Sequence, residues 1–184
     1  MVPVMHMAME IHNTTKIEAK NIMLDSEKKE LLESMVPKAV LKAVSDSAKN
    51  SIAKRVFSHD IIPIYNYPFR IGREARVQYT DGEVILQERH KLGGHEPNND
   101  TYLLDNGQFL QISREHCSIV KNPVTGTYIL QDRGSACGSR INKFAVGGDD
   151  SNGSCPLQDG DIITLGSKES EYKFKFILLD IDYN

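Results

Sequence analysis

Residues 113–120 are Ser113-Arg114-Glu115-His116-Cys117-Ser118-Ile119-Val120, a polar turn followed by an apolar run. The second half of this stretch has the composition of a short β-strand. An arginine side chain offers two parallel N–H donors to phosphate oxygens, and a serine hydroxyl adds a short third donor. The first half therefore indicates an anion-binding turn at the start of a strand, although a solvated turn would have the same residues.

Further short apolar runs, separated by turn residues, lie on both sides of this stretch. Asp81-Gly82, between two of these runs, is a strong signal for a β-hairpin. Pro63 is poorly suited to a central strand, so the first runs are expected near a sheet edge. Many short strands with glycine-rich turns indicate a β-sandwich or a barrel. The predicted strands are 61–65, 69–71, 77–79, 84–86, 102–104, 116–120, 128–130, 162–165 and 172–178.

Three other stretches provide groups that suit an anion site. Gly72-Arg73 follows a predicted strand, residues 134–142 form a glycine-serine loop, and residues 157–166 form a turn leading into a strand. Glycines let backbone amides approach a ligand closely and form an anion-binding concavity. Each stretch alone is a weak signal, but together they supply the parts of a dianion site.

The order and spacing of these pieces resemble the forkhead-associated (FHA) domain family over roughly residues 60–180. The family pattern runs Gly-Arg, Asn-Asp, Ser-Arg-x-His, a Ser-x-Asn-Gly loop and Leu-x-x-Gly-Asp-x-Ile-x-Leu-Gly. Here Gly72-Arg73, Asn99-Asp100, residues 113–116 and residues 157–166 match it in order. The resemblance implies a mainly β fold, an FHA-like sandwich of two antiparallel β-sheets, whose loops at one end bind phosphothreonine.

The resemblance also implies roles for individual residues. Arg73 and Ser113 are expected to contact the phosphate, and Arg114 is expected to add further charge. His116 is expected to brace the loops through hydrogen bonds without touching the ligand. The remaining site residues are structural (Gly72, Asn99 and Asp100) or belong to the loop that meets the peptide (Ala136, Cys137, Gly138, Ser139 and Arg140).

The sequence departs from the family pattern in this loop, where Ala136 and Cys137 replace the usual Thr and Asn. Alanine donates no hydrogen bond from its side chain, and a thiol is a weak donor and acceptor. Losing two neutral hydrogen bonds costs roughly 1–3 kcal/mol, which is on the order of ten- to a hundredfold in affinity. Ser135, Ser139 and Arg140 are the residues that can compensate.

A second departure is the segment between Arg73 and Asn99, which is longer than the usual link. This insert, about residues 74–97, contains the Asp81-Gly82 hairpin and the mixed-charge run 88–91. Because it follows Arg73 directly, it can form one wall of a peptide groove. The alternative is a solvated hairpin with no role in binding.

The N-terminal part of the chain has a different pattern. Residues 1–24 are predicted to be an extended or disordered tail, residues 25–58 a helical segment, and residues 60–184 the FHA domain. Apolar residues recur at a spacing of three to four between 31 and 56, which favours one bent amphipathic helix or a helical hairpin. Such a segment either packs against its own domain or binds a partner or a second copy.

Composition excludes several classes of protein. The chain has 184 residues, a formal net charge of -3 and a pI of about 6.1, so it has no general attraction to nucleic acid or acidic membranes. Its three cysteines include no CxxC pair, which argues against a disulfide framework or a zinc site and favours a reducing compartment. No apolar run is long enough to span a membrane. A cytoplasmic location is expected, with neither cofactor nor metal.

An enzyme is not expected. Cys117 follows His116 directly, and adjacent residues of a strand point to opposite faces, so they cannot act as a pair. Cys137 near His116 in space is the remaining alternative, a thiol-dependent enzyme. The predicted function is reversible binding of phosphothreonine in a partner protein, the substrate of a Ser/Thr kinase. The main alternative is a phospho-independent scaffold or oligomerisation module on the same fold, and the sequence does not predict an oligomeric state.

Overall fold

The computed structural model describes residues 25–32, 34–52, 60–74, 98–105, 109–148 and 153–179, together with the backbone of 76–80 and 83–87. The chain divides into two compact units, Met1–Val36 and Pro37–Asn184. The predicted tail, residues 1–24, and the charged part of the insert, residues 88–97, lie outside the described residues.

In the first unit, residues 25–32 and 34–35 are helical, so the N-terminal helical segment is short. The Asp25 carboxylate lies 3.7 Å from the Lys28 ammonium. Large apolar side chains of the segment are exposed, by 61%, 56% and 65% for Leu31, Leu32 and Met35.

The helical prediction is wrong for residues 39–43, which form the strand β1 (Ala39–Ala43). Asp46–Ser51 form a helix, α2, and the end of the predicted segment, residues 53–58, lies outside the described residues. In β1, residues 39, 41 and 43 are at most 2% exposed, whereas the residues between them, Val40 and Lys42, are more exposed, which is the period of a strand. β1 pairs with β13 (Lys173–Leu178) on one side and with β2 (Ile61–Ile64) on the other. Hydrogen bonds to these distant segments override the local helical spacing.

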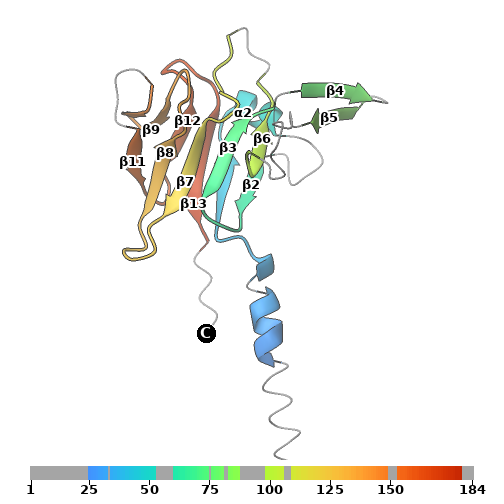
Figure 1. The fold of residues 1–184 in the computed structure, drawn as a ribbon, viewed down its shortest axis with the longest axis vertical. Helices are drawn as coiled ribbons and strands as arrows, with labels where there is room; N and C mark the ends of the chain where they lie inside the picture. The colour runs from blue at the N-terminus through green and yellow to red at the C-terminus, as the bar shows by residue number, and fades with distance from the viewer. Residues whose placement is uncertain are drawn as a thin grey trace, which may run out of the picture. The chain divides into compact units, whose positions relative to one another are not determined.

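The second unit is a sandwich of two β-sheets (Figure 1). One sheet has six strands in the order β10-β9-β12-β13-β1-β2, and all neighbours in it are antiparallel. Pro63 lies in β2, which is an edge strand as expected. The other strands of this sheet are β9 (Ser139–Ile141), β10 (Phe144–Val146) and β12 (Ile162–Leu165).

The other sheet has five strands in the order β11-β8-β7-β3-β6. β3 pairs with β6 in parallel, so this sheet is mixed where an antiparallel one was expected. Residues 76–80 and 83–87 form a separate antiparallel hairpin, in which Thr80 pairs with Glu83. The predicted Asp81-Gly82 turn between them lies outside the described residues. The strands are β3 (Phe69–Arg73), β6 (Thr101–Leu103), β7 (Cys117–Lys121), β8 (Tyr128–Asp132) and β11 (Ser154–Leu157), with β4 (Arg76–Thr80) and β5 (Glu83–Gln87) in the hairpin.

Each predicted strand is present, and β1, β9, β10 and β11 are strands that were not predicted. The two sheets enclose one apolar core that includes Leu41, Phe174 and Phe176 from one sheet and Ile71, Ile119 and Leu130 from the other. Because β3 and β8 both run antiparallel to β7, the end of β3, the start of β7 and the end of β8 meet. This topology brings Gly72-Arg73, residues 113–116 and residues 133–138 to one end of the sandwich.

Candidate functional site

Gly72 lies where the end of β3 packs against the turn that precedes β7. A Cβ atom at this position would lie 2.0 Å from the Arg114 carbonyl oxygen and 2.5 Å from the Asn99 amide nitrogen. No real side chain tolerates such contacts, so only glycine lets the three segments approach this closely. The Asn99 side chain is buried and donates from Nδ2 to the same Arg114 carbonyl at 2.8 Å.

Arg73, the next residue, makes three hydrogen bonds, two of which hold it against the segment of Ile112 and Ser113. Its backbone N–H donates to the Ser113 carbonyl at 2.8 Å, and its Nε donates to the Ile112 carbonyl at 2.9 Å. Its Nη1 makes a longer bond of 3.4 Å to the Glu74 carbonyl. Nη2 makes no hydrogen bond to any described residue. The half-buried guanidinium is thus held through Nε, while Nη2 keeps its N–H donors for a ligand.

Ser113 is held from two sides. Its backbone N–H donates to His116 Nδ1 at 2.9 Å, and its Oγ accepts from the Ala136 N–H at 2.9 Å. Since Oγ serves as an acceptor in this contact, its own proton remains available for a ligand. The neighbouring Arg114 side chain is exposed and forms no hydrogen bond or ion pair within the described part of the chain.

His116 connects the loops from the interior of the domain through hydrogen bonds. The imidazole is fully buried, and Nδ1 accepts a hydrogen bond, so Nε2 carries the proton and donates to Ser139 Oγ at 3.1 Å. Burial lowers the pKa of His116 to about 4, although the nearby Asp132 charge acts in the opposite direction. The ring is therefore neutral at physiological pH, and it ties the Ser113 turn to β9.

The serines of the glycine-serine loop were expected to be available to a ligand, but both are buried. Ser139 is 2% exposed and bonds to His116, and Ser135 is 7% exposed and donates to the Asp132 carboxylate. Neither hydroxyl can therefore compensate for the missing Thr and Asn. Asp132 also accepts from the N–H groups of Gly134 and Ser135, at 2.9 and 3.0 Å, which folds the loop over its own strand.

Of the other loop residues, Ala136 and Cys137 lie beside the phosphate-site candidates. Cys137 Sγ donates a weak hydrogen bond of 3.8 Å to the Leu110 carbonyl. Gly138 has a φ of +66°, and its carbonyl accepts from the Gly166 N–H at 2.9 Å. Arg140 lies instead on β9, where its Nη2 donates to the Lys143 carbonyl at 2.6 Å. It belongs to the sheet, not to the loop that faces the site.

Sequence reasoning missed Arg133. Its Nη1 donates to Asn99 Oδ1 at 2.6 Å, while its Nη2 donates to the Asn98 carbonyl at 3.0 Å and lies 3.4 Å from a Glu115 carboxylate oxygen. The guanidinium thereby locks the segment before β6 onto the turn before β7. The only signal in the sequence was that this arginine comes directly before the glycine-serine loop.

Asp100 faces a different neighbour. Its Oδ2 accepts from the Arg70 N–H at 2.7 Å and Nε at 3.0 Å, and its Oδ1 accepts from Nη2 at 3.1 Å. Burial alone would raise the pKa of Asp100, but the hydrogen bonds and charge of Arg70 outweigh it and lower the pKa. The pair anchors β6 to β3.

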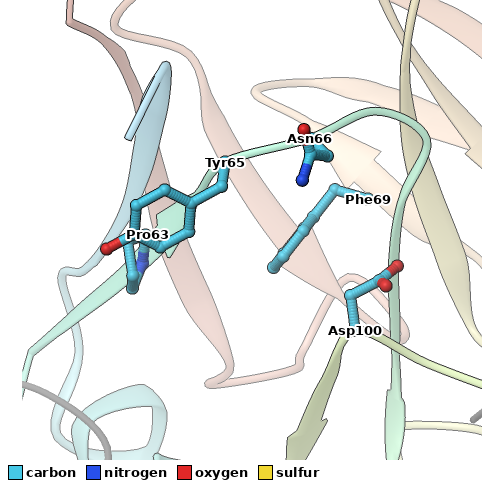
Figure 2. Close-up of a pocket in the computed structure, with 5 residues that line it drawn as sticks. All are labelled: Pro63, Tyr65, Asn66, Phe69 and Asp100. Atoms are coloured by element: carbon cyan, nitrogen blue, oxygen red, sulfur yellow. The ribbon is translucent and has the colours of Figure 1, made fainter. Parts of the chain in front are cut away.

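A hollow of about 280 Å³ lies at this edge of the sandwich, lined by Pro63, Tyr65, Asn66, Phe69 and Asp100 (Figure 2). The one carboxylate in it is already held by Arg70. Arginine and lysine side chains are absent from the lining residues, so this hollow is not a phosphate site.

Cys117 is not placed to act as a nucleophile. Cys117 is fully buried, and burial raises the pKa of its thiol to about 12, so it stays protonated. Within the described ranges, no group of three or more His, Cys, Asp or Glu side chains is placed to hold a metal ion. No helix in the same ranges is long and apolar enough to cross a membrane.

Comparison with known protein families identifies the family of the chain. Residues 69–166 match the FHA domain family, so the chain belongs to that family, whose members are interaction modules. No curated protein sequence matches the chain. An FHA domain of a hypothetical Arabidopsis thaliana protein is similar to it with 22% identity and a TM-score of 0.47, covering 81% of this chain and 92% of that one. Full-length yeast Pml1p is similar with 18% identity and a TM-score of 0.49, covering 77% and 81%.

Proposed function

We propose that this chain is a phosphopeptide-binding module that holds a phosphothreonine side chain at Arg73, Ser113 and Arg114. The proposal rests on the way Arg73 and Ser113 are held. Backbone hydrogen bonds fix both residues to one turn, yet Arg73 Nη2 and the Ser113 hydroxyl proton remain available to a ligand. Preorganised donors of this kind bind an anion without first having to be ordered.

A phosphothreonine presents a charge of about -1.5 to -2 and three acceptor oxygens. The tip of Arg73 and the Ser113 hydroxyl would each donate to these oxygens, and Arg114 would add a second cation. Bonds of this kind are charge-assisted and about twice as strong as neutral ones. Binding is reversible, and its affinity falls as salt screens the charges.

Residues that flank the phosphothreonine would meet the loop that precedes Ser113. Phe109 and Leu110 in this loop are 76% and 53% exposed. Leu110 also contacts Cys137 through its carbonyl, so the two loops are neighbours. An apolar flanking residue is therefore expected to bind better than a charged one.

The decisive experiment is a titration of the purified chain with a degenerate phosphothreonine peptide library. Unphosphorylated and phosphoserine libraries are run beside it. Arg73→Ala should abolish binding, and Ser113→Ala should weaken it about tenfold. Lys121→Ala is a matched control because Lys121 ends β7 and the site lies at the start of that strand. Equal binding of the phosphorylated and unphosphorylated libraries would contradict the proposal.

A second function is a phospho-independent scaffold or oligomerisation module. The observation that favours it is the exposure of Leu31, Leu32 and Met35 on one short helical segment. Partner binding through this segment would survive Arg73→Ala and be lost in a Leu31→Asp, Leu32→Asp double variant. Pull-down of the same partner with both variants therefore separates the two functions.

A further inference from the structure

The described outward positions of the six-stranded sheet carry cations and no carboxylates. On β13, Phe174 and Phe176 are buried in the core, so the alternating Lys173 and Lys175 point away from it. On β1 the same alternation turns Lys42 outward. The described outward positions of the sheet are Val40, Lys42, Ile61, Pro63, Arg140, Ala145, Ile162, Thr164, Lys173, Lys175 and Ile177.

The cations of this basic face (Lys42, Arg140, Lys173 and Lys175) are neighbours across the strands. Lys42 and Lys175 are direct partners in the register of β1 and β13. Thr164 pairs with Lys173 on one side and with Arg140 on the other. Two like charges opposite each other destabilise a sheet unless an anion neutralises them.

Carboxylates near the basic face include those of Glu171, Asp159 and Asp161. Lys42 and Lys175 form no ion pair or hydrogen bond within the described part of the chain. Lys173 lies 3.7 Å from Glu171, but with side chains 38% and 66% exposed this pair contributes little. At the end of the sheet, Asp159 accepts from the Leu178 N–H and Asp161 accepts from the Gln158 N–H, each at 2.8 Å. Lys42 and Lys175 thus have no ion-pair partner among the described residues, in a chain whose net charge is -3.

We propose that the basic face binds an acidic segment of a partner protein, at a site separate from the phosphate site. Apolar residues lie between the cations, as suits a segment that mixes acidic and apolar side chains. No outward position carries an aromatic ring on which nucleic acid bases could stack.

The test uses the full chain and an unphosphorylated, fluorescent peptide of alternating Glu and Val. The wild type should bind it, more weakly as salt rises. Lys42→Glu and Lys175→Glu should each weaken binding about tenfold, whereas Lys121→Glu on another part of the surface should not. Because Lys42→Glu replaces a repelling cross-strand pair with an attracting one, it should also raise Tm by about 1–3 °C. A variant that merely folds badly cannot lose binding and gain Tm together.

Phosphothreonine peptides are titrated against the same variants, and their affinity should stay within about twofold of the wild type. The two titrations test the basic face and the phosphate site separately, because either peptide can fail to bind while the other still binds. Equal binding of the Glu-Val peptide to the wild type and Lys42→Glu, Lys175→Glu would overturn the proposal. So would binding of phosphatidylserine vesicles or polyuridylate through these lysines without binding of the peptide.

Discussion

The backbone N–H of Ser113 donates to His116 Nδ1 at 2.9 Å, so a buried imidazole fixes the position of the serine that we assign to phosphate. The other nitrogen of the ring bonds to Ser139 on β9. His116 therefore connects the five-stranded sheet to the six-stranded one directly beneath the site. The ring is fully buried and holds the two segments together.

Replacing His116 should destabilise the domain. His116→Ala removes a fully buried ring and leaves the Ser113 N–H and the Ser139 hydroxyl without their partner. A cavity together with unsatisfied polar groups costs on the order of 2–4 kcal/mol. Tm should fall by roughly 4–16 °C, at about 2–4 °C per kcal/mol for a domain of this size. Thermal unfolding followed by circular dichroism measures this, and an unchanged Tm would show that the brace contributes nothing.

His116 should also make stability depend on pH. Burial lowers the pKa of the folded state to about 4, below an ordinary value of about 6.5 in the unfolded chain. Between these values the unfolded state binds more protons, so stability is complete above about pH 6.5 and falls as the pH drops toward 4. The whole loss amounts to about 3 kcal/mol. Urea unfolding between about pH 7 and pH 4 should show it, and His116→Asn should flatten the profile.

Gly72 should tolerate no side chain. Gly72→Ala forces a Cβ atom to within 2.0 Å of the Arg114 carbonyl, so β3 or the turn must move. Overpacking of this kind costs roughly 1–3 kcal/mol, and the shift also displaces Arg73. Gly153→Ala is the matched control, since nothing lies within 4 Å of a Cβ atom at that position. Urea unfolding measures the stability of both variants. Equal stabilities would contradict the close contact between Gly72 and the Arg114 carbonyl.

The sequence predicted nine of the strands and, through the family resemblance, a common place for Arg73 and Ser113. In the structure the Arg73 N–H donates to the Ser113 carbonyl at 2.8 Å, so the two residues are neighbours. β1 was mistaken for helix because its apolar residues also fit a spacing of three to four. Only its partners, β13 and β2, make it a strand.

Burial inside the site was beyond prediction from sequence. Ser139 was expected to face the peptide, yet it lies under the loop as the partner of His116. Arg133 was overlooked because its ligands, Asn98, Asn99 and Glu115, come from two segments that meet only in the folded chain. The burial of each polar side chain depends on how the two sheets pack, and a local sequence pattern does not predict this packing.

The loop that departs from the family pattern offers a gain of function. Ala136 and Cys137 stand where the family usually has Thr and Asn, and the buried Ser135 and Ser139 cannot take over their hydrogen bonds. Cys137 is half-buried, and its only described hydrogen bond is the weak one to Leu110. An amide at this position can donate to and accept from a peptide backbone.

Cys137→Asn should therefore tighten phosphothreonine-peptide binding by about tenfold, the equivalent of one or two hydrogen bonds. Isothermal titration with one peptide selected from the library measures the change. Val124→Asn is the control, because Val124 is 91% exposed in the turn at the opposite end of β7 and adds the same amide away from the site. If Cys137→Asn binds no better than the wild type, this loop does not hold the peptide backbone. Selectivity would then have to come from the loop of Phe109 and Leu110 on the other side of Ser113.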